Sequence, residues 1–394
     1  MTRTPTLASP ETRLLTTCSL FSGIAGIELG LARSGAARAV AYCERWAPAR
    51  AVLSDHFPET QIDNDVTSLT GLRGASLVTA GFPCTDLSQA GLTRGLEGLN
   101  SGLVLHVLHL VQQERPDWVL LENVPNMLHL GHGRAMARII QELEASGYQW
   151  AYRVLDSRFT GLAQRRRRVV LLASGAQDPA RLLLAEDAGP LPEPDDPKAF
   201  GFSWTEGNRG LGWAVGAVPT LRGGTTVRVP SPPAVWLPNA RSGYQIVRPS
   251  IEAAEALQGF EPGWTSAAPE RDRWKLLGNA VSTRVAEWLG VQLSRRNETT
   301  EAIWSEELLA DTAPWPTAAR GGDGKRWRTH VSEFPRHPGP NEQQDLASIL
   351  AEHGSDPLSY RATKGFRARL VRSHLRYRPD FLAALDAHIE LYSP

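Results

Sequence analysis

The chain has 394 residues, of which 42% are hydrophobic, and its formal net charge at pH 7 is zero. This length is enough for one large core or for about two or three smaller ones. The zero net charge argues neither for nor against a polyanionic partner, and any contact with nucleic acid must come from local patches. Three cysteines without a CxxC pair argue against a disulfide scaffold and a zinc site. Nothing at the amino end resembles a signal peptide and no apolar run could span a bilayer, so we expect a cytoplasmic protein without a metal ion or a membrane partner.

The first predicted strand and the turn after it form a candidate ligand site. An apolar, Thr-rich run at Leu14–Phe21 predicts the strand, and the glycine-rich segment Ser22–Leu31 predicts a turn that opens a helix. Such a turn lets backbone amides approach a ligand, although a purely structural helix start fits it about as well. The next predicted strand, Ala37–Cys43, ends in Glu44, and an acid about 20 positions beyond a glycine turn suits the two hydroxyls of a ribose.

The fourth predicted strand, Ser76–Ala80, leads into Gly81-Phe82-Pro83-Cys84. Glycine and proline cannot continue a central strand, so the strand ends abruptly there. A thiol is therefore presented at the carboxyl end of a strand, which is where open α/β sheets keep their ligand sites. The polar, glycine-rich residues up to 102 suit a loop that closes over a polar ligand. A lone cysteine is by default a buried, inert thiol, but this context favours a nucleophile under a lid.

The remaining elements of the first half complete an alternating pattern. A third short strand ends near Asp65, and the fifth, Trp118–Leu121, leads into Glu122-Asn123-Val124-Pro125. The segment Gln164-Arg165-Arg166-Arg167-Arg168 precedes the last strand of this part. The other expected elements are helices at Ala47–His56, Ser101–Gln113 and Gly133–Ser146 and strands at Tyr148–Leu155 and Val169–Ala173. Strands alternating with helices over about 170 residues predict a doubly wound, mostly parallel α/β sheet.

The second half of the chain has a different composition. Residues 186–246 are rich in proline and glycine, with short β-like pieces at Ala217–Leu221, Thr225–Val229 and Tyr244–Val247. Helical patterning returns at Ser250–Leu257 and at Ser282–Ser294, beyond Gly278-Asn279-Ala280. We therefore divide the chain into a first domain (1–175), a small domain of loops and strands (176–247), a return to the first domain (248–294) and a C-terminal accessory region (295–394).

The accessory region contains one unusual charge pattern. Residues 361–378 include seven basic residues and no acidic one, with apolar residues interleaved at helical spacing. A basic amphipathic helix of this kind could lie along a phosphate backbone. A solvated helix face that docks on the main body explains the pattern equally well, so both interpretations stay open.

Taken in order, these motifs make the sequence resemble the cytosine-5 DNA methyltransferases that depend on S-adenosylmethionine, over about residues 14–294. The resemblance implies that Cys84 attacks carbon 6 of the cytosine, while Glu122 and Arg168, with support from Arg166, stabilise the charge that develops on the ring. It implies cofactor contacts at Phe21, Gly23, Gly26, Glu44, Asp65 and Asn279. It implies contacts with the substrate DNA at Phe82, Pro83, Ser88, Gln89, Asn123 and Gln164.

Some positions depart from the family pattern. Ser19 and Ala25 replace an aspartate and a glycine of the first cofactor motif, and Arg45 stands where an aromatic residue usually follows the ribose-binding acid. The loop also reads Thr85-Asp86 after the cysteine, where many relatives have a Gln-Pro pair. An aspartate such as Asp65 also commonly begins a turn, without any ligand.

The implied function is transfer of a methyl group from S-adenosylmethionine to carbon 5 of a cytosine in a specific site of double-stranded DNA. The target atom is inaccessible inside a duplex, so the base must be flipped out. We expect a monomer of prokaryotic or phage origin that serves restriction–modification or phage defence, with a cognate endonuclease or defence proteins as partners. The alternatives are the same chemistry on RNA, a catalytically idle DNA-binding regulator, and a nicotinamide-dependent dehydrogenase. The last rests on the glycine turn alone.

Overall fold

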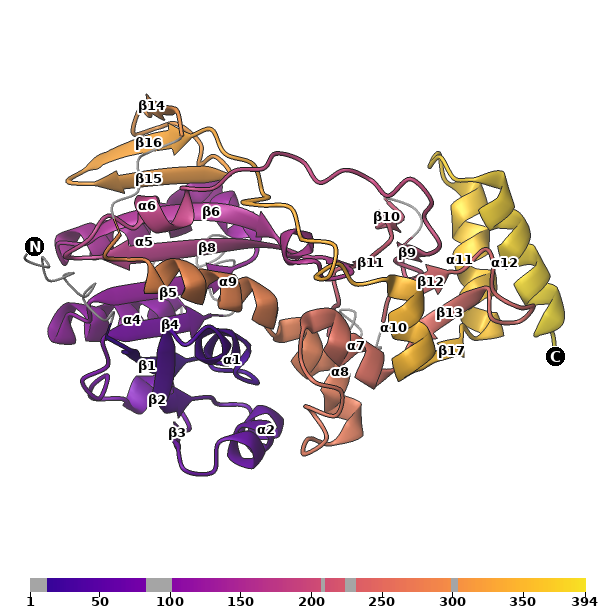
Figure 1. Ribbon diagram of the computed structural model, residues 1–394, viewed down its shortest axis with the longest axis horizontal. Helices are drawn as coiled ribbons and strands as arrows, with labels where there is room; N and C mark the ends of the chain where they lie inside the picture. The colour runs from indigo at the N-terminus through magenta and orange to yellow at the C-terminus, as the bar shows by residue number, and fades with distance from the viewer. Residues whose placement is uncertain (1–12, 83–100, 207–209, 224–231, 299–303) are drawn as a thin grey trace, which may run out of the picture.

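The computed structural model describes residues 13–82, 101–206, 210–223, 232–298 and 304–394. Within these ranges a large sheet and a small sheet lie side by side (Figure 1), and each is covered by helices. The strand expected at Thr225–Val229 lies outside the described residues. No described helix is both apolar enough and long enough to span a membrane.

One half of the large sheet is parallel. Its strands are β3 (Gln61–Asp63), β2 (Ala37–Cys43), β1 (Leu15–Leu20), β4 (Leu77–Gly81) and β5 (Trp118–Asn123), adjacent in that order. The order reverses between β1 and β4, so the crevice beyond their carboxyl ends is a topological switch point, where open α/β sheets bind their ligands. The helices α1 (Gly26–Arg33), α2 (Ala47–His56), α4 (Ser101–Glu114) and α5 (Arg134–Ala145) connect or flank these strands. The predicted doubly wound α/β fold is confirmed.

The other half of the large sheet is antiparallel, so the sheet is mixed and not mostly parallel as the sequence predicted. After β5 come β8 (Arg167–Ser174), β6 (Gln149–Asp156), β15 (Ala318–Gly322), β16 (Lys325–Thr329) and β14 (Glu306–Leu308). The last three strands come from the region that the sequence analysis assigned to a C-terminal accessory region. A Cβ atom at Gly321 of β15 would lie 2.8 Å from a ring atom of Trp150. Glycine therefore lets the hairpin pack closely on β6.

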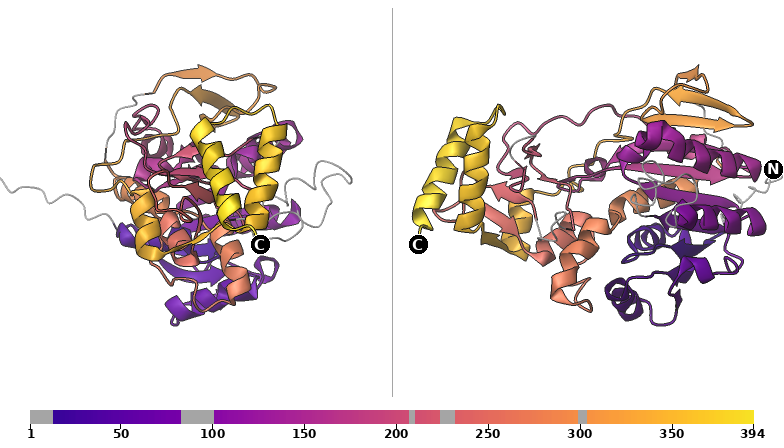
Figure 2. Two further views of the ribbon diagram at one scale, coloured as in Figure 1. Left: turned by 90° about the vertical axis from the view of Figure 1, so that its right-hand side faces the viewer. Right: turned by 180° about the vertical axis from the view of Figure 1, so that it is seen from behind.

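The small sheet also receives residues from the end of the chain. Its order is β10 (Ala214–Val215), β9 (Phe200–Phe202), β12 (Ala234–Trp236), β13 (Ile246–Pro249) and β17 (Ser355–Pro357). Helices α11 (Tyr360–Arg372) and α12 (Pro379–Leu391) lie side by side at the far end of the molecule (Figure 2) and pack on this sheet. The shared core contains Phe200, Phe202, Trp236, Phe366, Leu370, Phe381 and Leu385. The C-terminal helices thus complete the core of the small domain.

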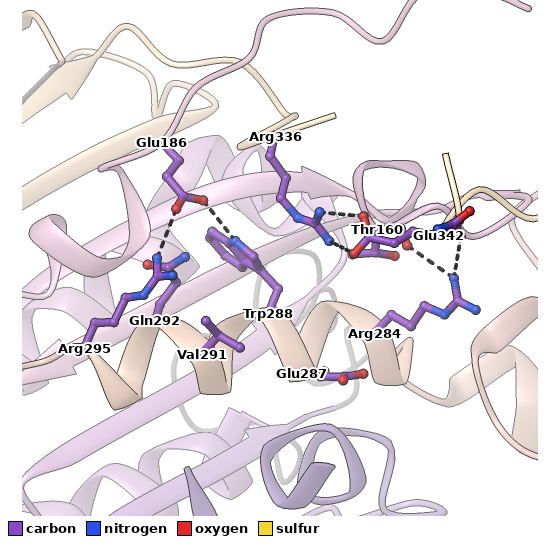
Figure 3. Close-up of a pocket in the computed structure, with 11 residues that line it drawn as sticks. Thr160, Glu186, Arg284, Glu287, Trp288, Val291, Gln292, Arg295, Arg336 and Glu342 are labelled. Atoms are coloured by element: carbon purple, nitrogen blue, oxygen red, sulfur yellow. Dashed lines mark hydrogen bonds and ion pairs between the residues drawn. The ribbon is translucent and has the colours of Figure 1, made fainter. Parts of the chain in front are cut away.

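A strap, residues 330–345, carries the chain from β16 to α10 (Leu346–His353) and is fastened to helix α9 (Thr283–Ser294). Arg284 of α9 donates to the carbonyl oxygen of Glu342 at 2.9 Å, and the Glu342 carboxylate pairs with Arg336 at 2.7 Å. Figure 3 shows these contacts around a polar pocket of about 520 Å³. Gln344 then donates its backbone N–H to Gly161 at 2.8 Å. The strap therefore contacts α9 as well as the segment that leads to the arginine run.

Helices α1 and α9 touch along their backbones at Gly30. A Cβ atom there would lie 2.5 Å from the backbone nitrogen of Glu287 and 2.6 Å from Cβ of Ala286. We expect Gly30→Val to lower the free energy of unfolding by about 3 kcal/mol, because the clash is largely with backbone and the helices must separate. Urea and thermal unfolding would measure the change. The control is Gly210→Val, at a position where a Cβ atom would have no described atom within 4 Å. An equal loss in both variants would contradict the packing argument.

Candidate active site

The turn after β1 has an unusual backbone. Phe21, Gly23 and Ala25 have φ angles of 55°, 57° and 63°, in the left-handed region that only glycine adopts without strain. Ser22 lies between them, and its hydroxyl donates to the carbonyl oxygens of Ser19 (3.0 Å) and Cys43 (3.2 Å). These bonds tie the ends of β1 and β2 together. Strained residues of this kind gather where a ligand approaches the backbone.

Glu44 is held at the edge of this turn. Its two carboxylate oxygens accept hydrogen bonds from the backbone nitrogens of Gly23 (2.8 Å) and Trp46 (2.7 Å). Among the described residues, no group lies within 4 Å of where a Cβ atom of Gly23 would be, so none of them fills the space in front of it. The arrangement fits a nucleoside whose ribose hydroxyls donate to the remaining lone pairs of Glu44.

Asp65 lies after β3 and begins a short 3₁₀ turn. Its Oδ1 accepts hydrogen bonds from the backbone nitrogen of Thr67 at 2.9 Å and from the Thr67 hydroxyl at 2.8 Å. These bonds lower the pKa of the carboxyl group. Oδ2 lies 4.0 Å from Nε of Arg45. The turn-forming role and a ligand contact through Oδ2 are both compatible with this geometry.

Gly26 and Asn279 have other surroundings than Gly23. A Cβ atom at Gly26 would overlap the carbonyl group of Val281, so this glycine serves close packing between α1 and the turn before α9. Asn279 ends α8 (Glu270–Asn279) and lines a different pocket, together with Arg168.

Glu122 lies at the end of β5, opposite Gly81 of β4 in the parallel register. Its carboxylate pairs with Arg168 of β8, with 2.8 Å between Oε1 and Nε. Both side chains are largely buried, at 9% and 15% exposure, and Oε2 lies 3.6 Å from where a Cβ atom of Gly81 would be. The strand pairing therefore brings an acid and a guanidinium group beside the residues that lead to Cys84.

Asn123 anchors the same segment from the neighbouring strand. Its side-chain nitrogen donates to the carbonyl oxygen of Phe82 at 3.0 Å, and its oxygen accepts from the backbone nitrogen of Val124 at 2.8 Å. The Phe82 side chain is 4% exposed and packs in the core beneath the sheet. Both side chains act within the protein here, fixing the backbone just before the cysteine.

Arg166 and Gln164 lie on either side of Arg165 and point inward. Arg166 donates to the carbonyl oxygens of Leu221 (3.2 Å), Gly278 (3.0 Å) and Ala280 (2.6 Å). Burial, followed by the charge of Arg168, lowers the pKa of Arg166. Gln164 is fully buried on β7 (Gln164–Arg165), which pairs with β11 (Val218–Pro219). Its side chain donates to the carbonyl oxygen of Leu257 and accepts from the backbone nitrogen of Leu221, each at 3.0 Å. These side chains tie the arginine run to the segment after β11 and to the residues at 257 and 278–280.

A pocket of about 510 Å³ opens beside Arg168, between the end of β5 and the 220–223 segment. Its lining is strongly basic and comprises Val124, Pro125, Arg165, Arg167, Arg168, Thr220, Leu221, Arg222, Gly223, Gly278 and Asn279. Arg222 at its rim pairs with Glu206 at 2.6 Å. Pro83, Cys84, Ser88 and Gln89 lie outside the described residues, so the pocket is described without them.

Comparison with known proteins agrees with this geometry. The family described as C-5 cytosine-specific DNA methylase matches residues 15–198. The Type II methyltransferase M2.BsuMI of Bacillus subtilis (strain 168) is 42% identical over 389 residues, covering 93% of this chain and 96% of that protein. The chain belongs to the C-5 cytosine-specific DNA methylase family. Since only 7% of this methylase lies outside the match, most of residues 295–394 are included in it.

Two further comparisons show how far the similarity extends. The Type II methyltransferase M.Bsp6I of Bacillus sp. (strain RFL6) is 31% identical to the methylase over 163 residues, covering 40% of this chain and 52% of that protein. Among solved structures, S. pombe Dnmt2 methyltransferase has a TM-score of 0.57 and covers 72% of this chain and 99% of its own. Its identity is 15%, so this similarity concerns the fold alone.

One buried acid of the methylase had no role in the sequence analysis. Glu28 on α1 accepts a hydrogen bond from the Thr79 hydroxyl of β4 at 2.6 Å, and burial raises the pKa of its carboxyl group. It ties α1 to β4 across β1, directly beneath the strained turn. In the sequence Glu28 is one acid in an amphipathic helix, so only the packing of the helix on the sheet identifies it.

Proposed function

We propose that this methylase transfers a methyl group from S-adenosylmethionine to carbon 5 of a cytosine that is flipped out of duplex DNA, through a covalent adduct with Cys84. The observation that supports this most is the buried pair of Glu122 and Arg168 beside the strand end that leads to Cys84. A thiol, a carboxyl group and a guanidinium group at one strand edge are the groups that attack on carbon 6 requires.

Residues on the β1 side would hold the cofactor. The open space before Gly23 and the carboxylate of Glu44 suit its ribose, and Phe21 and Asp65 would flank its adenine. When bound, S-adenosylmethionine supplies an electrophilic methyl group and would leave as S-adenosylhomocysteine. Gly26 would act by bringing the turn before α9 close rather than by touching the cofactor, and Asn279 lies on the side of the DNA-facing pocket.

The proposed reaction assigns a role to each group on the β4–β5 edge. The thiolate of Cys84 adds to carbon 6, and the electron pair displaced from the ring makes carbon 5 nucleophilic. Glu122 would contact ring nitrogen 3 and the exocyclic amine, and Arg168 the carbonyl oxygen, so that both stabilise the developing charge. After carbon 5 has accepted the methyl group, it loses its proton to water or hydroxide, and the electrons of that bond expel the Cys84 thiolate.

The small domain would recognise the DNA sequence. It faces the basic pocket through the 220–223 segment. Phosphate contacts there would fix the position of the protein along the duplex, while contacts in the grooves would read the bases. The biological role that we propose is protection of host DNA from a cognate endonuclease, as the modification partner of a restriction–modification system. Phage defence follows from that role.

Bisulfite sequencing of plasmid DNA from a methylation-deficient bacterial host that expresses the protein would test the proposal. We expect one short sequence context to be fully protected from conversion, and only with the intact gene. The purified protein should transfer labelled methyl groups to duplex DNA containing that context. Labelling of tRNA alone, with no labelling of duplex DNA, would contradict the proposal and favour the RNA alternative.

A further inference from the structure

Helix α11 and the turn after it concentrate basic charge on a chain whose net charge is zero. Seven basic residues occur between 361 and 378, and no acidic residue lies between Asp356 and Asp380. Two of the seven are paired: Arg367 with Asp386 at 2.7 Å, and Arg378 with Asp380 at 2.6 Å. Arg378 also lies over aromatic rings of the small-domain core.

Four others are exposed to solvent, and we call them the basic face: Arg361, Lys364 and Arg372 on α11, and Arg376 just beyond its end. None of them forms an ion pair with an acidic side chain within the described residues. On α11 the basic residues Arg361, Lys364 and Arg372 lie on one side of the helix together with position 368, because these positions are three or four residues apart. The opposite side, with Thr363, Phe366 and Leu370, is buried against the small sheet. The basic face must therefore point to solvent.

The basic face is continuous with the rim of the active-site pocket. Arg369 lies on α11 beside the basic face. It donates to the carbonyl oxygens of Trp204 (2.7 Å) and Glu206 (2.8 Å). The Glu206 carboxylate in turn holds Arg222, which lines the pocket beside Arg168. One chain of contacts thus links the C-terminal half of α11 to the place where the target base must enter.

The dimensions and the charge fit a DNA backbone. Residues 361–372 rise about 16 Å along the helix axis, the length of about five phosphate steps along one strand. These four cations pair with no acidic side chain of the described residues, so they repel one another, and phosphates would relieve that repulsion. The chain has equal numbers of basic and acidic residues. A helix face that served only for solvation would not need to gather basic residues without acidic ones.

We propose that the basic face of α11 binds the phosphate backbone of the duplex that flanks the methylated site. This extends the footprint of the enzyme beyond the bases that it reads and rests on the proposed function. The contacts would contribute affinity but no sequence information, because phosphates are the same at every step.

The test is the salt dependence of DNA binding by a variant in which Arg361, Lys364, Arg372 and Arg376 are all replaced by Gln. The plot of log binding constant against log salt concentration should become shallower by about 0.9 for each phosphate that the variant no longer neutralises. Affinity should fall on a long duplex, and little on a short one that ends just outside the site. The kcat on saturating DNA and the site of methylation should stay unchanged.

Two controls keep the result interpretable. A variant with Arg38, Arg138, Arg181 and Arg295 changed to Gln removes as many exposed charges from the large-sheet side and should keep the wild-type slope. Changing Arg361, Arg372 and Arg376 to Lys keeps the charge and should also keep the slope. If the Gln variant folds, as circular dichroism would show, and keeps the wild-type slope on the long duplex, the inference is wrong. If the wild-type protein methylates no duplex DNA, the proposed function itself fails.

Discussion

Replacing Cys84 with alanine is expected to lower methylation of duplex DNA by at least about 10⁴-fold, because no other group can take over the attack on carbon 6. The variant should still bind DNA, because the basic pocket and α11 are untouched. A duplex with fluorine on carbon 5 of the target cytosine gives a second readout. Fluorine cannot leave as a proton does, so the wild-type protein should form an adduct that survives denaturing electrophoresis, and Cys84→Ala should form none.

The other two cysteines provide the control. Burial raises the pKa of Cys18 to about 12 and that of Cys43 to about 12, so both remain protonated near neutral pH and neither is a nucleophile. Cys43→Ala should therefore still form the adduct. Adduct formation by Cys84→Ala, or its loss in a folded Cys43→Ala protein, would place the nucleophile elsewhere.

The second large effect is expected for Glu122→Gln. The amide keeps the size of the side chain but removes the negative charge beside Arg168 and the carboxyl group beside the ring, and kcat should fall about 10²–10³-fold. The affinity for DNA should change much less, because the duplex is held mainly by contacts outside the base pocket. Single-turnover rates with saturating cofactor would measure the effect on catalysis. A separate binding measurement would give the effect on DNA affinity.

The adjacent position on β8 offers a matched control. Arg167 pairs with Glu333 of the strap, in the same kind of arginine–carboxylate contact but more exposed to solvent. Glu333→Gln should leave kcat within about twofold, as expected for a surface pair. If both variants lose activity equally, the effect of Glu122 is structural and its assignment to the ring is wrong.

The parallel half of the fold was predictable because its elements carry strong local signals. Strand β2 and helix α2 begin and end where the sequence predicted, since a glycine turn and an acidic strand end bound them. The hairpin of β15 and β16 was not predicted. Its sequences, Ala-Ala-Arg-Gly-Gly and Lys-Arg-Trp-Arg-Thr, have little alternation, and its packing surface is supplied by Trp150 of another strand. Helix α8 was missed because most of its side chains are polar.

The site was predictable to the extent that residue type determines it. Glu122 and Arg168 could be named from their motifs, but their 2.8 Å contact depends on the register of β5 against β8. The inward roles of Gln164 and Arg166 depend on carbonyl groups more than 50 residues away along the chain, at Leu221 and Leu257 among others. No local pattern encodes such partners, so a motif cannot distinguish a side chain that joins domains from one that touches the substrate.

The route of the chain has a consequence for how the enzyme is made. The chain runs from the large sheet to the small one after β8, returns through α9 to β14–β16, and crosses again along the strap to β17 and the final helices. All the proposed catalytic motifs lie before residue 294, yet the small domain takes an edge strand and both covering helices from residues beyond it. We therefore expect a chain that ends before β17 to lack a complete small-domain core and to methylate no DNA.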